Sequence, residues 1–369
     1  MQRKETVMKY DMKLLLEDGQ EYCGYSFGGR GKGVYELVFI TSMTGYQEIL
    51  SDPSYAGQAV VMSYPLIGNY GMADGDYESE KPSIGALVVR EYNERPSGSR
   101  CAESLGSVME RQGIIGISGI DTRKLVRSIR DYGSRKALIA DSDLPKDEGL
   151  KILSKAEIPD NLARQAGCKK AEHIRAEHED FHVVALDCGM KQNIIRTFNK
   201  LNCSVTKLPF DTPVGEILSL KPDGLFISNG PGNPVSLPET IETVRCLKGK
   251  IPIFGICLGH QILSLSYGAE TYKLKFGHRG GNHPVKNLST GKVEITSQNH
   301  SYAVDMESLT KTALSATHIN LLDGTVEGVC CAEERAFGVQ YHPEGAPGPM
   351  EGAYLFKEFA MMMEGCRNA

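Results

Sequence analysis

The sequence predicts an α/β protein in which an N-terminal mixed α/β domain is joined to a C-terminal domain with a doubly wound, mostly parallel sheet. The chain has 369 residues, enough for two or three domains with well-filled cores. From Phe181 onward, short apolar runs typical of buried strands alternate with segments typical of helices. Such alternation favours a parallel sheet covered by helices, and ligands bind such sheets beyond the carboxyl ends of the strands.

The same patterns divide the chain into domains. We expect a first domain at 1–153, a polar linker rich in His and Glu at 154–180, and a second domain at 181–369. The strand-like runs of the first domain lie at 13–16, 34–40, 85–90 and 137–140, and a helical segment lies at 121–132. Those of the second domain lie at 182–187, 205–208, 224–228, 252–255 and 336–339, with helical segments at 191–200 and after Cys257.

The overall composition is that of an ordinary globular chain, with 41% apolar and 24% charged residues. The 41 basic and 46 acidic side chains give a net charge of −5, so nothing draws the whole chain toward nucleic acid or an anionic membrane. Residues 1–7 lack a signal-type apolar core, and no run approaches the ~18 apolar residues that a bilayer crossing needs. Because the ten cysteines are scattered and form no CxxC pair, we expect reduced thiols and a cytoplasmic location.

Cys257 is the most informative residue of the chain. It lies between Gly255 and Gly259, where the apolar run 251–254 gives way to a helical segment. The glycines let the backbone turn sharply and let neighbouring segments come close. Because the dipole at a helix start favours a thiolate, the pattern predicts a nucleophile elbow with sulfur in place of a hydroxyl. The alternative is a buried structural cysteine.

His342 is the base that we expect for this thiol. It follows the strand-like run 336–339, and Glu344 lies two residues further on. In an extended chain, residues i and i+2 project on the same side, and Pro343 disfavours a helical conformation in its predecessor. The carboxylate can therefore orient the imidazole and select its tautomer. The alternative is that His-Pro-Glu forms a surface turn.

Acyl chemistry also needs hydrogen-bond donors for a developing oxyanion. We expect the backbone N–H of Leu258, at the start of the helix, to be one donor. The second is the N–H of Gly230 or Gly232, since neither residue has a side chain in the way. The alternative is that residues 228–232 form only a tight turn.

Together these segments resemble the class I, or triad, glutamine amidotransferases, whose pattern has a Cys in Gly-x-Cys-x-Gly, a late His-x-Glu and a Gly-Pro-Gly loop. Other segments of the chain narrow the resemblance to the small, glutamine-hydrolysing subunits of carbamoyl phosphate synthetase. The segments that carry this narrower resemblance are 41–55, 120–125, 276–285 and 298–300. It extends over nearly the whole chain, including an N-terminal domain that other amidotransferases lack.

The resemblance implies that the chain hydrolyses L-glutamine through a γ-glutamyl thioester. Cys257 would be the nucleophile, His342 the base and Glu344 its orienter. Ammonia would pass to a large subunit that makes carbamoyl phosphate for pyrimidine and arginine biosynthesis. ATP, Mg²⁺ and bicarbonate would bind to that subunit of the heterodimer, and no cofactor to this chain. The implied glutamine-binding residues are Ser54, Gly230, Gly232, Leu258, Gln261, Asn299, Ser301 and Tyr302.

Two of these residues depart from one common form of the family, which has glycine at 301 and often phenylalanine at 302. If the contact at Ser301 is made by the backbone, serine is tolerable provided that its φ is negative. Ser54 also has an ordinary alternative, because a serine next to a proline often caps or turns the chain.

Histidines elsewhere do not predict a metal site. His173, His178 and His182 lie in or beside the polar linker, and their spacings do not match a helical i,i+4 pair throughout. His278 and His283 are expected to shape a glycine-rich loop. We therefore expect no metal on this chain.

Two basic features also receive structural interpretations. The glycine-rich run 28–33 lacks the P-loop pattern, because glycine follows Lys32 where Ser or Thr is needed, and we expect a hairpin loop there. We expect four cationic side chains on the helical segment 121–132 either to be solvated or to contact the partner subunit. They are Arg123, Lys124, Arg127 and Arg130.

Two competing functions stay open. An amidotransferase serving another synthetase, such as those for GMP or anthranilate, is disfavoured by the N-terminal segments. A non-enzymatic regulatory or scaffolding subunit is disfavoured by the intact Cys257, His342 and Glu344.

Overall fold

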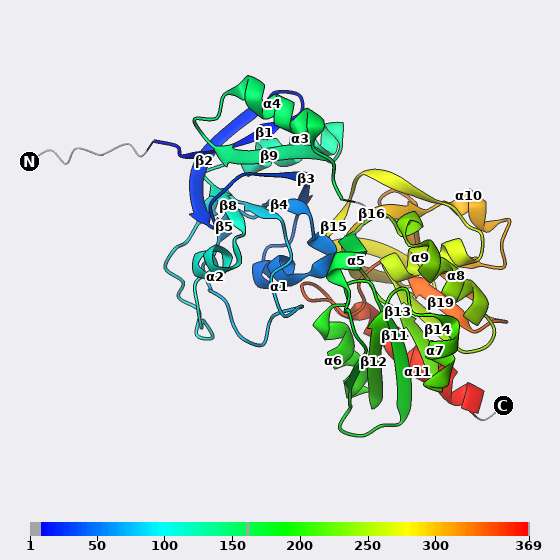
Figure 1. Cartoon of the computed structure of the whole chain (residues 1–369). Helices are drawn as coiled ribbons and strands as arrows, with labels where there is room; N and C mark the ends of the chain where they lie inside the picture. Colours follow the sequence, from blue (N-terminus) through cyan, green and yellow to red (C-terminus); the bar gives the residue numbers. More distant parts are fainter. Residues whose placement is uncertain (1–8, 160–161, 368–369) are drawn as a thin grey trace, which may run out of the picture. The chain divides into compact units, whose positions relative to one another are not determined.

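The computed structural model describes residues 9–159 and 162–367, which form two compact units (Figure 1). Residues 1–7, for which no signal-type core is predicted, lie outside the described part. Within it, unit 1 holds residues 9–47, 57–76 and 84–158, and unit 2 holds 48–56, 77–83, 159 and 162–367. Two short segments of the N-terminal half thus belong to unit 2. The predicted domain boundaries at 153 and 181 stay predictions.

Unit 1 is built on a closed seven-stranded barrel in the order β1-β2-β8-β6-β4-β3-β9. The pairs β3–β4, β4–β6 and β6–β8 are parallel and the other pairs are antiparallel. The barrel strands are β1 (Met12–Leu16), β2 (Glu21–Gly28), β3 (Gly33–Ile40), β4 (Gln58–Met62), β6 (Ala86–Val88), β8 (Ile115–Ser118) and β9 (Arg135–Asp141). A separate two-stranded sheet pairs β5 (Leu66–Ile67) with β7 (Glu91–Tyr92).

Three helices contact the outside of this barrel: α2 (Leu105–Gln112), α3 (Thr122–Tyr132) and α4 (Lys146–Lys155). The helix α3 begins where expected because the Asp121 carboxylate accepts a hydrogen bond from the Lys124 backbone N–H at 3.0 Å. The short helix α1 (Tyr46–Ser51) spans the division between the two units. The predicted mixed α/β character of the N-terminal half is confirmed.

Unit 2 contains a ten-stranded sheet in the order β10-β12-β11-β13-β14-β19-β18-β17-β15-β16. Its five central strands, from β12 to β19, are parallel, which confirms the predicted parallel sheet. The antiparallel extension from β18 to β16 was not predicted. The strands are β10 (Glu172–Ile174), β11 (Phe181–Asp187), β12 (Cys203–Pro209), β13 (Gly224–Ile227), β14 (Ile253–Ile256), β15 (Thr271–Asn287), β16 (Val293–Val304), β17 (Ser315–Asn320), β18 (Val326–Cys331) and β19 (Ala336–Val339).

Alternate residues of β11 face two separate hydrophobic cores. Val183 and Ala185 pack with α6 (Gln192–Lys200) and α11 (Tyr354–Arg367), whereas Val184 and Leu186 pack on the opposite face. The helices of that opposite face are α5 (Leu162–Ala166), α7 (Val214–Ser219), α8 (Pro238–Leu247) and α9 (Leu258–Ser266). Both faces of the sheet are therefore covered, which confirms the doubly wound arrangement.

The remaining helical elements are short. They are α10 (Met306–Leu309) and the 3₁₀ turns η1 (Pro53–Tyr55), η2 (Pro234–Ser236) and η3 (Glu351–Ala353). Among the described helices, none combines the length and the apolar composition that a bilayer crossing requires.

Two glycines allow α9 to approach the centre of the sheet closely. A Cβ added at Gly259 would lie 2.0 Å from the carbonyl oxygen of Ile227 in β13. A Cβ added at Gly255 would lie 2.6 Å from the backbone of Gly259. Because backbone meets backbone here, no side-chain adjustment can make room. These contacts fix the N-terminal end of α9, where Cys257 lies.

We expect Gly259→Ala to destabilise the fold by at least about 1–3 kcal/mol, the usual cost of overpacking a core. The measurement is the free energy of urea unfolding. The matched control is Gly365→Ala in α11, where an added Cβ meets nothing within 4 Å. That change should stabilise the chain by up to about 1 kcal/mol, because alanine is the better helix former. Equal stability of the two variants would contradict the close-packing argument.

Candidate active site

Cys257 occupies the corner between β14 and α9 in a backbone conformation that is rare for a side chain other than glycine. Its φ is 53° and its ψ is −104°. Such a conformation costs about 1–3 kcal/mol and persists only where the surroundings impose it. The Cys257 backbone N–H donates to the Val339 carbonyl at 2.9 Å, which ties the corner to β19. The buried Sγ lies 3.6 Å from the Asn299 carbonyl oxygen. This is the geometry of a nucleophile elbow.

His342 and Glu344 form a buried pair just beyond β19. His342 Nδ1 lies 2.7 Å from Glu344 Oε1, and both side chains are almost fully buried. Since the carboxylate occupies Nδ1, Nε2 is the nitrogen left for chemistry, and it has no hydrogen-bond partner among the described residues. Burial opposes the charged imidazole, but the Glu344 carboxylate and the nearby Cys257 thiol together raise the pKa of His342 above its ordinary value.

Lys191 is a member of the site that the sequence did not point to. Its Nζ lies 3.0 Å from Glu344 Oε1 and donates to the Gly345 carbonyl, and the side chain is 3% exposed. Burial would raise the pKa of Glu344, but the Lys191 ammonium and the His342 imidazole lower it below its ordinary value. The carboxylate is therefore held ionised between two cationic partners. Only the folded arrangement distinguishes this lysine from a surface lysine at a helix start.

Ser54 is connected to the rest of the site through Asp52. The Asp52 carboxylate caps η1 by accepting from the Ser54 backbone N–H at 2.9 Å, and its other oxygen accepts from Asn299 Nδ2 at 3.0 Å. Capping is therefore done by Asp52. The Ser54 hydroxyl instead accepts a hydrogen bond from Asn229 Nδ2 at 3.0 Å. The Asp-Pro-Ser order is a turn-capping signal that could have revealed Asp52.

The loop after β13 approaches the chain too closely for side chains. A Cβ at Gly230 would lie 2.3 Å from the Cys188 carbonyl oxygen, and Gly232 has a φ of +98°. Leu258 is the first residue of α9, so its backbone N–H belongs to the unpaired first turn of that helix. The roles of Gly230, Gly232 and Leu258 in oxyanion stabilisation and glutamine binding stay predictions.

Two other predicted binding residues, Gln261 and Ser301, make side-chain hydrogen bonds within the protein. Gln261 Nε2 donates to the Tyr302 carbonyl at 2.8 Å and to Gln340 Oε1 at 2.9 Å. The Ser301 hydroxyl accepts from Arg279 Nη2 at 2.6 Å. Ser301 is not among the described non-glycine residues with positive φ, so the condition set for a backbone contact at this position is met. Glutamine contacts by these side chains stay predictions.

The structure also describes two features for which no ligand was predicted. The glycine-rich run 28–33 connects β2 to β3, but these strands are not neighbours in the barrel. The predicted hairpin is therefore wrong, because β2 pairs with β1 and β8, and β3 pairs with β4 and β9. His173 and His182 share the Thr206 hydroxyl at 2.8 and 2.7 Å. These hydrogen bonds explain the positions of both imidazole rings without a bound ligand.

We expect Glu344→Gln to lower the free energy of unfolding by about 3–5 kcal/mol, because it leaves the Lys191 ammonium buried without its counter-charge. The measurement is urea unfolding near pH 6. The control is Glu364→Gln, an exposed change on α11 that should have little effect.

The same pair of variants tests the pH dependence. The lowered pKa of Glu344 contributes stability that is lost as pH falls below its ordinary value of 4.5. The raised pKa of His342 contributes stability that is lost as pH rises above its ordinary value of 6.5. The stability difference between wild type and Glu344→Gln should therefore be greatest between these values. A difference that grew toward alkaline pH would refute the assigned pair.

Two protein-family models match this chain. The model described as "Glutamine amidotransferase class-I" matches residues 184–362. The model described as "Carbamoyl-phosphate synthase small chain, CPSase domain" matches residues 14–139.

Individual relatives match over nearly the full length. The chain is 48% identical over 350 residues to the carbamoyl phosphate synthase small chain of Listeria innocua, covering 95% of this chain and 96% of that protein. For the small chain of Staphylococcus epidermidis the identity is 49%, with 95% of each chain covered. For that of Chlorobaculum tepidum the identity is 50%, with 96% and 98% covered. The chain therefore belongs to the family of carbamoyl phosphate synthase small chains, as its motifs indicated.

Proposed function

We propose that this chain hydrolyses L-glutamine at Cys257 and passes the ammonia to the large, ATP-dependent subunit of a carbamoyl phosphate synthase. Membership of the small-chain family supports the glutaminase role. One observation carries the assignment of residues. A cysteine at a strained strand-to-helix corner lies near an imidazole whose other nitrogen is held 2.7 Å from a buried carboxylate.

The first half of the reaction forms a thioester. The raised pKa of His342 favours its imidazolium form, so the imidazole can hold the proton that Cys257 gives up when its sulfur attacks. The thiolate attacks the side-chain amide carbon of glutamine, and the carbonyl oxygen becomes an oxyanion. The backbone N–H groups of Leu258 and Gly230 stabilise that charge. When the C–N bond breaks, His342 Nε2 gives its proton to the departing nitrogen, which leaves as ammonia.

The second half releases glutamate. His342, now neutral, takes a proton from water, which attacks the thioester carbon. The C–S bond breaks, the thiolate returns, and the imidazolium is restored. The net reaction is glutamine plus water giving glutamate plus ammonia. Glu344 keeps the Nδ1–H tautomer throughout, and Lys191 keeps Glu344 ionised.

The proposal places the remaining chemistry outside this chain. ATP, Mg²⁺ and bicarbonate bind to the large subunit of the heterodimer, which makes carbamoyl phosphate for pyrimidine and arginine biosynthesis. The hydrolysis of glutamine needs no cofactor. We also propose a cytoplasmic location, with neither nucleic acid nor membrane as a partner, in keeping with the net charge of −5.

We expect Cys257→Ser in the assembled complex to lower glutamine-dependent carbamoyl phosphate synthesis by at least about 10³-fold, since a serine hydroxyl lacks the thiolate character of the cysteine. Ammonia-dependent synthesis should survive, because it bypasses this site. The matched control is Cys246→Ser, at an exposed cysteine, which should leave both activities unchanged.

Three outcomes would count against the proposed function. Glutamine-dependent turnover that persists in Cys257→Ser would exclude this nucleophile. Glutamate release without carbamoyl phosphate, despite a bound large ATP-dependent chain, would indicate an amidotransferase that serves another synthetase. Failure of the assembled complex to release glutamate would indicate a non-enzymatic subunit.

We expect Ser54→Ala to raise KM for glutamine about 5–10-fold with little change in kcat, because a lost hydrogen bond of about 1 kcal/mol would weaken ground-state and transition-state binding alike. Steady-state kinetics of the complex provide the measurement, with the exposed Ser219→Ala as control. An unchanged KM would remove Ser54 from the binding residues.

A further inference from the structure

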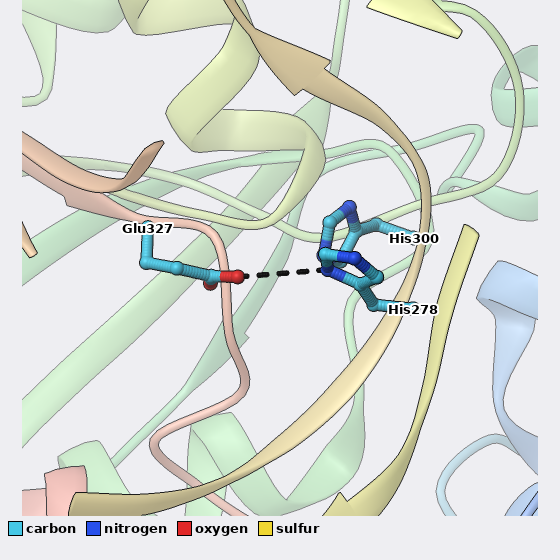
Figure 2. Close-up of side chains that lie close together, drawn as sticks. All are labelled: His278, His300 and Glu327. Atoms are coloured by element: carbon cyan, nitrogen blue, oxygen red, sulfur yellow. Dashed lines mark ion pairs between the residues drawn. The ribbon is translucent and has the colours of Figure 1, made fainter. Parts of the chain in front are cut away.

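A second cluster of chemically active side chains lies in the antiparallel part of the unit 2 sheet. His278 on β15 is the register partner of His300 on β16, so their rings meet across the two strands, with centroids 4.9 Å apart. Glu327 reaches them from β18 (Figure 2). All three side chains are buried, and one ligand atom from each lies within 4.8 Å of the others.

Both imidazoles are oriented by a hydrogen-bond acceptor at one nitrogen. His278 Nε2 lies 2.9 Å from Asp323 Oδ2, and His300 Nδ1 lies 2.7 Å from the Tyr302 carbonyl oxygen. Because these oxygens only accept, the hydrogen of each neutral ring sits on that nitrogen. In that neutral form, which metal binding requires, the lone pairs are on His278 Nδ1 and His300 Nε2. Within the described part of the chain, neither atom has a hydrogen-bond partner. Metal-binding histidines are oriented in this way.

The carboxylate of Glu327 is equally well fixed. Oε1 accepts from Asn320 Nδ2 and Oε2 from Gln298 Nε2, both at 2.9 Å, and the side chain is 0% exposed. Each oxygen keeps a lone pair. Among the described residues, His278 is the ion-pair partner of this buried carboxylate. This partner is an imidazole, which carries a positive charge only when it is protonated.

The spacing suits a shared ion better than a direct bond. Glu327 Oε1 lies 3.7 Å from His278 Nδ1, which is too long for a hydrogen bond. Two ligands held about 2.0–2.2 Å from one tetrahedral ion are about 3.4 Å apart. A shift of a few tenths of an ångström would therefore bring both atoms into a coordination sphere.

We propose that His278, His300 and Glu327 bind a divalent transition-metal ion of the Zn²⁺ type. Two imidazoles and a carboxylate are a common ligand set for such ions, and three protein ligands leave a fourth position for water. The proposal revises the sequence-based expectation of no metal on this chain. It is independent of the glutaminase assignment, although His300 follows Asn299, whose carbonyl oxygen lies 3.6 Å from Cys257 Sγ.

The test is titration of the metal-stripped full-length chain with Co²⁺ alone, followed by visible absorption. We expect one equivalent to bind with the d–d bands of a four-coordinate site and without an intense thiolate-to-cobalt band. His278→Asn and Glu327→Gln should each lower the affinity at least about 100-fold, and Asp323→Asn about 10–100-fold. The control is His178→Asn, at an exposed histidine, which should bind Co²⁺ as the wild type does.

The experiment measures metal binding and not glutamine turnover. Its result therefore tests the metal site separately from the proposed function. Because the Asp323 side chain is 38% exposed, we expect Asp323→Asn to fold. This variant therefore tests the site even if the variants at buried positions fail to fold. Absence of one-equivalent binding by the wild type would overturn the proposal. Equal affinity in wild type, Asp323→Asn and Glu327→Gln, or a spectrum dominated by thiolate, would overturn it as well.

Discussion

The buried ion pair between Lys191 and Glu344 is the interaction on which the site depends. The two side chains are 3% and 0% exposed, so water stabilises neither charge and each requires the other. The same oxygen, Glu344 Oε1, also lies 2.7 Å from His342 Nδ1. The orientation of the base is therefore set from two directions, by the chain after β19 and by Lys191 at the turn between β11 and α6. Removal of the lysine charge would release the carboxylate that holds the imidazole.

Sheet order explains how residues far apart in the sequence meet. The strands β14 and β19 are parallel neighbours, and their carboxyl ends lie at the same edge of the sheet. Cys257 directly follows the first strand and His342 comes shortly after the second. The positive φ at Cys257 is an unfavourable conformation that the neighbouring backbone imposes. Gly259 packs against Ile227, and the Cys257 N–H donates to Val339, so the corner cannot relax without loss of contacts on both sides.

Local patterns predicted the elements that carry the chemistry, but not the residues that support them. The glycine-flanked Cys257 and the His342-x-Glu344 spacing are visible in a few consecutive residues, and so are the apolar runs of the parallel strands. Lys191 and Asp52 act through partners 154 and 247 positions away in the chain. The periodic pattern of apolar residues in the sequence does not reveal contacts between residues so far apart. The antiparallel extension escaped prediction for a related reason, because β15 and β16 pair with register shifts that interrupt the alternation of side chains.

The histidines show a limit of predicting metal ligands from their spacing in the sequence. An i,i+4 criterion detects ligands on one helix, and it gave no reason to group His278 with His300. On antiparallel strands the relevant relation is register, which makes these two residues direct partners. The hydrogen bonds of the ring nitrogens then distinguish a candidate set of metal ligands from a pair of histidines that only pack together. His173 and His182 meet at a shared hydroxyl, and their hydrogen bonds are satisfied there. His278 and His300 each have one nitrogen oriented and the other without a partner in the described chain, beside the buried side chain of Glu327. The proposed metal ion would satisfy all three side chains at once.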